Sequence, residues 1–131
     1  MTIRFYSLKD QVRCDERGRV VFPFESGLDL LPKNCDLTSL HLVSTEAGAV
    51  RGNHRHPNTA EWLHVVDGAL TLYWEEDGRV QSKQITGAND LVYIPAGTPH
   101  AIKNTGKQSS LLMAVREKNP SGPHTETYPI V

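Results

Sequence analysis

The sequence of 131 residues lacks a long apolar run, and no segment approaches the roughly 18 consecutive apolar residues that a membrane-spanning helix needs. Its first residues also lack the basic segment followed by an apolar one that is typical of a targeting signal. These two absences exclude a membrane span and predict a cytoplasmic location.

The sequence also lacks an excess of one charge. Lys and Arg total 14, Asp and Glu total 15, and both kinds are scattered along the chain. Binding to nucleic acid or to an anionic membrane requires clustered basic residues. We therefore expect neither a nucleic acid nor a membrane as a partner.

Cysteine is scarce, since only Cys14 and Cys35 occur and no Cys-x-x-Cys spacing exists. This usage fits a reducing compartment better than a disulfide scaffold, and we expect free thiols. The length suits a single domain over residues 1–131, with an N-terminal arm over 1–16 and an extended C-terminal tail over 117–131.

Helical periodicity of useful length is absent too. Short apolar and alternating runs instead follow one another between turn residues, including Asp67-Gly68 and Asp77-Gly78. The expected strands cover residues 20–25, 36–45, 54–56, 61–66, 69–76, 79–86, 91–94, 100–104 and 109–117, with a loop or single helical turn over 27–34 and a turn over 87–90. This pattern predicts an all-β antiparallel sandwich or barrel, and of these we favour a jelly roll.

Alternation along two of these strands predicts which side chains face the core. In the strand over 36–45 we expect Leu40 and Leu42 to point inward. In the strand from 61 the expected inward residues are Glu61, Leu63 and Val65. The expected outward residues, which would meet another layer or a second subunit, are Trp62, His64 and Val66.

Two histidines and a carboxylate lie within eight residues of one another in the segment 48–68. His54 and His56 are two residues apart, so they leave one face of a strand. Residues 57–59 form a turn, and antiparallel pairing would then bring Glu61 opposite the histidines. His100 is the best candidate for a fourth ligand. Such a set suits a divalent transition metal such as Zn, Mn, Fe, Ni or Co.

The spacing of these residues carries a family resemblance. Gly48-x5-His54-x-His56-x4-Glu61-x6-Gly68 resembles the first cupin motif at every defined position, and Pro95-x-Gly97-x2-His100-x3-Asn104 resembles the second. The cupin pattern has a glycine where this sequence has Asn89. The resemblance implies a jelly-roll barrel that binds a metal at one end through the four ligands named above, and commonly a homodimer.

A narrower resemblance concerns residues 15–25, 51–56 and 119–131. These segments look like the cupin domain of bifunctional capsular-polysaccharide enzymes that epimerise nucleotide 4-keto sugars. Residues 15–18 and 51–56 are also similar to nucleotide-sugar ketoisomerases. The sequence contains no counterpart of the reductase domain of the capsular enzymes. The resemblance therefore implies an isolated epimerase or isomerase step on a small molecule, such as a nucleotide sugar.

The leading hypothesis for the chemistry is that a divalent ion polarises a sugar ketone and stabilises the enediolate formed when the neighbouring carbon loses a proton. Arg51, Asn53 and Tyr93 are candidate orienting or substrate-binding residues, with Tyr93 and Arg51 as the catalytic candidates. His41 and His64 are expected to be packing or interface residues.

Three other hypotheses remain open. The protein is a metal-dependent dioxygenase in the first and a noncatalytic binding or sensor module in the second. In the third, His54 and His56 act directly as acid and base without a metal.

Overall fold

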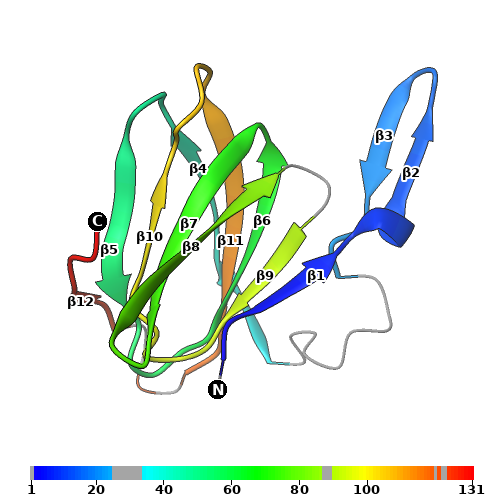
Figure 1. Ribbon diagram of the computed structural model, residues 1–131. Coiled ribbons are helices and arrows are strands. Elements are labelled where there is room, and N and C mark those ends of the chain that lie inside the picture. The colour runs from blue at the N-terminus through cyan, green and yellow to red at the C-terminus, as the bar shows by residue number, and fades with distance from the viewer. Residues whose placement is uncertain (1, 25–33, 87–89, 120, 122–123) are drawn as a thin grey trace.

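Two facing antiparallel sheets form the body of the protein in a computed structural model, which describes all residues except 1, 25–33, 87–89, 120 and 122–123 (Figure 1). The first sheet has the order β1 (Arg4–Ser7), β9 (Asp90–Ile94), β6 (Glu61–Asp67), β11 (Ser110–Glu117) and β4 (Cys35–Thr45). The second has the order β12 (Glu126–Thr127), β5 (Val50–Arg55), β10 (His100–Lys103), β7 (Ala69–Glu76) and β8 (Arg79–Thr86). This is the predicted all-β jelly roll.

The core lies between the two sheets because strands of both carry apolar residues at every second position. Val65 and Val92 of the first sheet meet Leu72 and Ile85 of the second, and all four are fully buried. Leu63 belongs to the same cluster, so the inward orientation predicted for Leu63 and Val65 is confirmed.

A second apolar cluster covers the outer face of the first sheet. Trp62 and Tyr93 pack there with Leu8, and the partly buried Tyr6 and Val21 close the cluster from the N-terminal segment. The prediction that Trp62 meets another layer is therefore confirmed, and this chain itself supplies that layer. His64 is buried as well, with Nδ1 3.3 Å from the backbone oxygen of Asp90.

The N-terminal segment has more structure than the predicted arm. It contains β1, a short 3-10 helix η1 (Lys9–Gln11) and a separate hairpin of β2 (Val12–Asp15) and β3 (Gly18–Val21), which extends away from the body in Figure 1. The strand predicted over 20–25 ends at Val21, since Pro23 cannot donate to a ladder. The predicted loop over 27–34 lies almost wholly outside the described residues, as do residues 87–89, including Asn89.

Of the predicted hairpins, one is present and two are replaced by connections between the sheets. Asp77 and Gly78 join β7 to β8 with φ values of 51° and 73°, as a tight hairpin turn requires. Asp67-Gly68, by contrast, leads from β6 in the first sheet to β7 in the second. Residues 56–60 likewise lead from β5 to β6 across the sheets, so the predicted pairing of the histidine strand with the Glu61 strand is wrong. A turn between two strands looks the same in a sequence whether or not the strands pair.

The orientation predicted for the strand over 36–45 is also wrong. Leu40 and Leu42 of β4 are 44% and 61% exposed, whereas Val43 packs against the core and His41 lines a pocket. β4 lies at the edge of its sheet, and its inner face borders this pocket rather than the centre of the core. Apolar residues in a strand therefore did not identify its inner face here.

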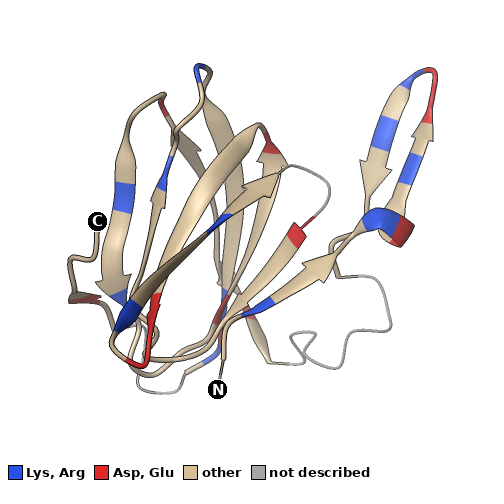
Figure 2. Cartoon of the chain, in the orientation of Figure 1, with Lys and Arg blue, Asp and Glu red and all other residues tan. Residues whose placement is uncertain are grey.

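In the tail, β12 pairs with β5 through Glu126 and Thr127, and an extended tail over the whole of 117–131 stays a prediction. Cys14 and Cys35 are free thiols. Figure 2 shows basic and acidic residues interspersed over the strands of both sheets. Among the described residues, no helix has the length and apolar character needed to cross a membrane.

Candidate metal centre

Strand pairing between β5 and β10 brings three histidines together. His100 lies opposite His54 in the register of these two strands, and His56 follows directly after β5. Gly52, with φ +87°, lets the strands approach, because a Cβ at this position would lie 3.1 Å from the Ala101 Cα. His54 and His100 are 46 residues apart in the sequence (100 − 54), and the hydrogen-bonded pairing of β5 and β10 brings them together.

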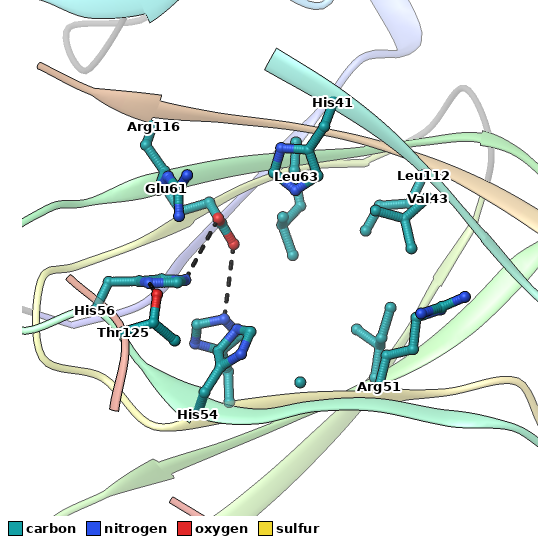
Figure 3. A pocket seen from close by; sticks show the side chains of 14 residues that line it. His41, Val43, Arg51, His54, His56, Glu61, Leu63, Leu112, Arg116 and Thr125 are labelled. Atoms are coloured by element: carbon teal, nitrogen blue, oxygen red, sulfur yellow. Dashed lines mark hydrogen bonds and ion pairs between the residues drawn. The ribbon is translucent and has the colours of Figure 1, made fainter. Parts of the chain in front are cut away.

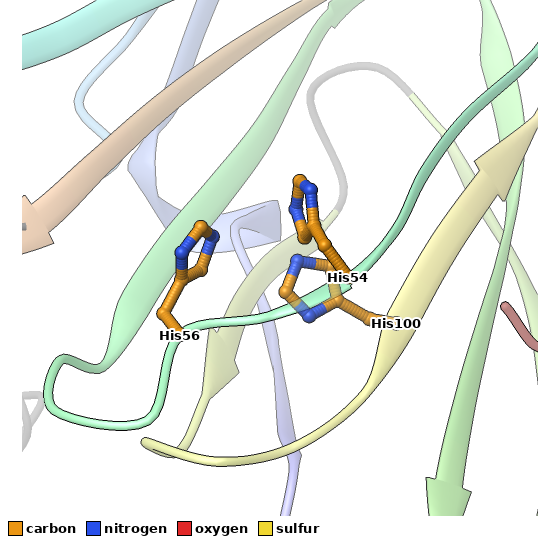
Figure 4. A group of neighbouring side chains, drawn as sticks. All are labelled: His54, His56 and His100. Carbon is orange, nitrogen blue, oxygen red and sulfur yellow. The ribbon is translucent and has the colours of Figure 1, made fainter. Parts of the chain in front are cut away.

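The three imidazoles converge on one point (Figure 4). One ring nitrogen from each of His54, His56 and His100 lies within 4.8 Å of the others. The ring centroid of His54 is 4.6 Å from that of His56 and 4.8 Å from that of His100. Such spacing suits three ligands of a single ion.

Hydrogen bonds orient two of the rings. His100 Nδ1 donates to the Thr98 carbonyl oxygen at 2.9 Å, which leaves its Nε2 with a lone pair. His56 Nδ1 lies 3.0 Å from Thr125 Oγ1. The Nε2 atoms of His56 and His100 are buried and have no hydrogen-bond partner among the described residues. Buried nitrogens without a partner are costly, and a metal ion would satisfy them.

Glu61 reaches this point from the opposite sheet (Figure 3). Its Oε2 lies 3.6 Å from His56 Nε2, and its Oε1 lies 3.6 Å from His100 Nε2. These distances are too long for hydrogen bonds. The carboxylate is therefore adjacent to both nitrogens without bonding either of them.

Burial fixes the charge states of this group. It lowers the pKa of His56 to about 4 and that of His100 to about 3, so both rings are neutral near pH 7. Burial also lowers the pKa of His54 and raises the pKa of Glu61 to about 7. Because the two imidazoles are neutral, the 3.6 Å contacts of Glu61 are not ion pairs. Neutral imidazoles and a carboxylate together form a donor set that fits a divalent transition metal.

The four residues lie at one end of a pocket of about 280 Å³. Its middle is apolar, with walls from both sheets. The apolar wall residues are Val43, Leu63, Ile102, Leu112 and Ala114. Four polar side chains complete the lining, namely His41, Arg51, Arg116 and Thr125. Arg116 of β11 lies opposite Glu61 of β6 in the strand register, and its positive charge acts on the Glu61 carboxyl.

The structure places the other candidate residues in different surroundings. Arg51 lines the pocket, and its Nε donates to the Ser44 backbone oxygen at 3.0 Å. Tyr93 lies outside this lining, in the second apolar cluster, with its ring centroid 5.3 Å from that of Trp62. Asn53 binds the C-terminal tail, because its Oδ1 accepts from the backbone nitrogens of Ile130 and Val131.

Sequence reasoning missed three pocket residues, His41, Arg116 and Thr125. Alternation along 36–45 places His41 and Val43 on one face, opposite Leu40 and Leu42, which are predicted to point inward. Arg116 shares a face with Leu112 and Ala114, a signal that was available in the sequence. No local pattern marks Thr125, which reaches the site only because β12 pairs with β5.

The sequence over residues 41–116 matches the model of the cupin domain family, and the chain belongs to this family. It is also 32% identical over 127 residues to the oxalate decarboxylase OxdC of Bacillus subtilis, covering 83% of this chain and 33% of the relative. A germin-like protein 9-2 of Oryza sativa, described as putative, is 34% identical over 61 residues, which is 47% of this chain and 28% of that protein. The chain thus spans about a third of the length of these curated relatives.

Solved structures with the same fold include proteins of similar size. A 3,4-ketoisomerase from Helicobacter canadensis superimposes with a TM-score of 0.71 at 16% identity, over 95% of this chain and 90% of that one. The capsular polysaccharide assembling protein CapF from Staphylococcus aureus gives a TM-score of 0.63 at 22% identity, over 70% and 28% of the respective chains. The 3,4-ketoisomerase QdtA from Thermoanaerobacterium thermosaccharolyticum, a mutant in complex with TDP-4-keto-6-deoxyglucose, gives 0.71 at 10% identity over 93% and 86%.

Proposed function

We propose that this cupin binds a divalent transition metal ion through His54, His56, Glu61 and His100, and that it isomerises or epimerises a sugar-type substrate next to a ketone. The observation that carries the proposal is the placement of the Glu61 carboxylate between two buried imidazole nitrogens that have no partner among the described residues. A cation at this point would satisfy all of these groups together.

The residues around this group would bind and orient the substrate. A bound ion would supply Lewis-acid polarisation of a substrate oxygen, which favours loss of a proton from the neighbouring carbon. Arg51 and Arg116 line the pocket as cations and would hold anionic or oxygen-rich parts of the substrate. The apolar wall between them excludes water from the reacting carbons.

The extent of the structural match favours the ketoisomerases as the analogy to test first. Both ketoisomerases are covered to at least 86% by this chain, whereas the oxalate decarboxylase is covered to 33%. At identities of 16% and 10%, the match to the ketoisomerases establishes a shared fold. The reaction is proposed by analogy, and its support comes from the residues of the site. A nucleotide sugar is accordingly the substrate class to test first.

Proton exchange in deuterated water tests the reaction directly. The metal-loaded protein should introduce deuterium next to the ketone of TDP-4-keto-6-deoxyglucose, followed by proton NMR. A panel of nucleotide 4-keto sugars without any uptake would contradict the proposed isomerase. Oxygen consumption during the same incubation would instead indicate the dioxygenase of the alternative hypothesis.

The ligand set is tested by His54→Ala. We expect this variant to lose stoichiometric metal and proton exchange together, as measured by elemental analysis and NMR. His124→Ala is the matched control, because the His124 side chain is exposed and lies outside the pocket lining. Full metal content in His54→Ala would contradict the proposed ligands.

A further inference from the structure

We propose that His41 is the acid–base residue of this pocket, the group that removes the proton next to the ketone and returns it. This inference rests on the proposed isomerase function. It concerns a histidine that lies apart from the three clustered ones and belongs to β4 in the sheet that faces them.

The position of His41 leaves room for a substrate in front of the candidate metal ligands. Figure 3 shows His41 on the opposite side of the pocket from His54, with Glu61 and Leu63 near it. His41 and His54 both line the cavity of about 280 Å³. A small carbonyl compound in this cavity would therefore have the three clustered histidines on one side and the His41 imidazole on the other.

A hydrogen bond gives His41 the tautomer of a base. Its Nδ1 lies 2.7 Å from the Ser39 carbonyl oxygen, which can only accept, so Nδ1 carries the proton. Nε2 then has the lone pair, and no hydrogen bond to Nε2 is found among the described residues. This arrangement is that of a general base oriented by a backbone carbonyl.

The backbone under His41 is itself held in place. Ser39 Oγ donates to the Asp36 carbonyl oxygen at 2.6 Å and accepts from the Arg116 backbone nitrogen at 2.8 Å. These bonds lie at a bulge where the register of β4 and β11 shifts between Ala114 and Arg116. Bulges commonly redirect a side chain beside a functional site.

The other pocket residues are less suited to proton transfer. The three clustered histidines and Glu61 face one another, and a bound metal would take up the lone pairs with which they could accept a proton. Arg51 and Arg116 present guanidinium groups, which donate hydrogen bonds and have no lone pair to accept a proton. Within the lining formed by described residues, His41 is thus the imidazole that remains outside the candidate ligand set.

The proposed step balances without any co-reactant. His41 Nε2 takes the proton from the carbon next to the ketone and becomes an imidazolium, while the electron pair of the broken C–H bond moves toward the carbonyl oxygen. For the ketone to move, the proton returns to the former carbonyl carbon while the hydroxyl proton of the neighbouring carbon passes to the former carbonyl oxygen. Inversion at the original carbon instead takes a proton from solvent on the opposite face. Because His41 is exposed, the imidazolium exchanges its proton with solvent between the two steps.

The test compares His41→Gln with wild type and with His124→Gln as a matched control. His41→Gln should lose deuterium uptake into TDP-4-keto-6-deoxyglucose by about 10²–10⁴-fold, the usual contribution of a general base. Its metal content should equal that of wild type, and added imidazole should restore part of the exchange. His124→Gln should exchange at the wild-type rate.

A second readout uses the metal-free wild-type protein. Long-range ¹H–¹⁵N spectra should show His41 protonated at Nδ1, and a ring protonated at Nε2 would overturn the proposal. Uptake in His41→Gln at the wild-type rate would also overturn it while leaving the proposed isomerase intact. Absence of uptake in wild type would overturn both, which distinguishes failure of the function from failure of His41 alone.

Discussion

Thr125 lies beside a candidate ligand ring, with its Oγ1 3.0 Å from His56 Nδ1. A partner at Nδ1 fixes the orientation of the ring and the availability of Nε2. The side chain thus links the end of the chain to the metal centre.

Replacing this hydroxyl tests the link. Thr125→Val keeps the shape and removes the hydrogen bond, so metal affinity should fall by about 10–100-fold. Competition with a chelator of known affinity measures the change. Thr127→Val is the control, because Thr127 is exposed and lies outside the pocket lining. Equal metal affinity in Thr125→Val and wild type would show that the tail does not orient His56.

Gly52 allows a prediction about the close approach of β5 and β10. In Gly52→Ala the new Cβ would lie 3.1 Å from both the Ala101 Cα and the His100 carbonyl oxygen. Gly48→Ala is a matched control, since its φ of +81° resembles +87° at Gly52 and nothing lies within 4 Å of its Cβ. Both variants carry the cost of a left-handed alanine, and only Gly52→Ala should also separate His54 from His100.

The two variants should therefore differ in metal binding more than in any other property. We expect metal affinity to drop in Gly52→Ala and to stay near wild type in Gly48→Ala, as measured by calorimetric titration. Denaturant unfolding should show Gly52→Ala to be the less stable of the two. Equal metal affinity in both variants would contradict the steric argument.

At the scale of elements, the C-terminal strand β12 and the residues after it are attached to β5 and, through Glu75, to β7. Arg55 Nε lies 2.7 Å from Glu126 Oε2, and the Tyr128 hydroxyl donates to Glu75 Oε2 at 2.6 Å. Asn53 adds three hydrogen bonds to the last residues and does so with φ 54°, a conformation that asparagine tolerates. This attachment holds Thr125 beside the pocket.

The attachment can be weakened without straining the backbone. Asn53→Gly accepts the positive φ and removes the side chain, so the amides of Ile130 and Val131 should lose protection from hydrogen exchange. Asn53→Asp keeps the Oδ1 acceptor and should retain most of this protection. Unchanged exchange of both amides in Asn53→Gly, followed by NMR, would show that the amide does not hold the tail.

Sequence patterns predicted the strands well and their partners poorly. The short buried run over 91–94 and the strand over 79–86 appear almost unchanged, because alternation and turn residues are local properties. Pairing depends on how the sheets fold against one another, so β5 and β6 lie in different sheets although a turn joins them. Motif spacing predicts the candidate ligands, and alternation along β11 indicates Arg116, whereas the position of Thr125 depends on the long-range register of β12.

At the scale of the whole molecule, the candidate ligands belong to both sheets. His54 and His100 lie on strands of the second sheet, and Glu61 lies on a strand of the first. A ligand bound by these residues would therefore stabilise the contact between the two sheets. Ligands that bind only the folded state raise stability by mass action.

Metal removal should consequently lower the thermal stability of the whole fold. At a free metal concentration about 100 times the Kd, the stabilisation amounts to roughly 2.7 kcal/mol, which calorimetry with and without a chelator would detect. His54→Ala should show no response to the chelator. Identical melting temperatures of wild type with and without metal would contradict a site shared between the sheets. Sedimentation of the same samples tests the homodimer, which stays a prediction, as does the cytoplasmic location.

The orientation of β4 has a consequence for how this strand finds its register. A slip by one residue would turn Leu40 and Leu42 inward and His41 outward, because side chains alternate along a strand. Such a slip would bring two leucines to the inner face, where burial favours apolar side chains, and would turn Val43 outward, which packs against the core. The observed register instead depends on the bulge between β4 and β11 and on the hydrogen bonds of Ser39. The register of β4 thus conflicts with the preference of Leu40 and Leu42 for burial, and the polar bonds at the bulge hold the register that forms the pocket.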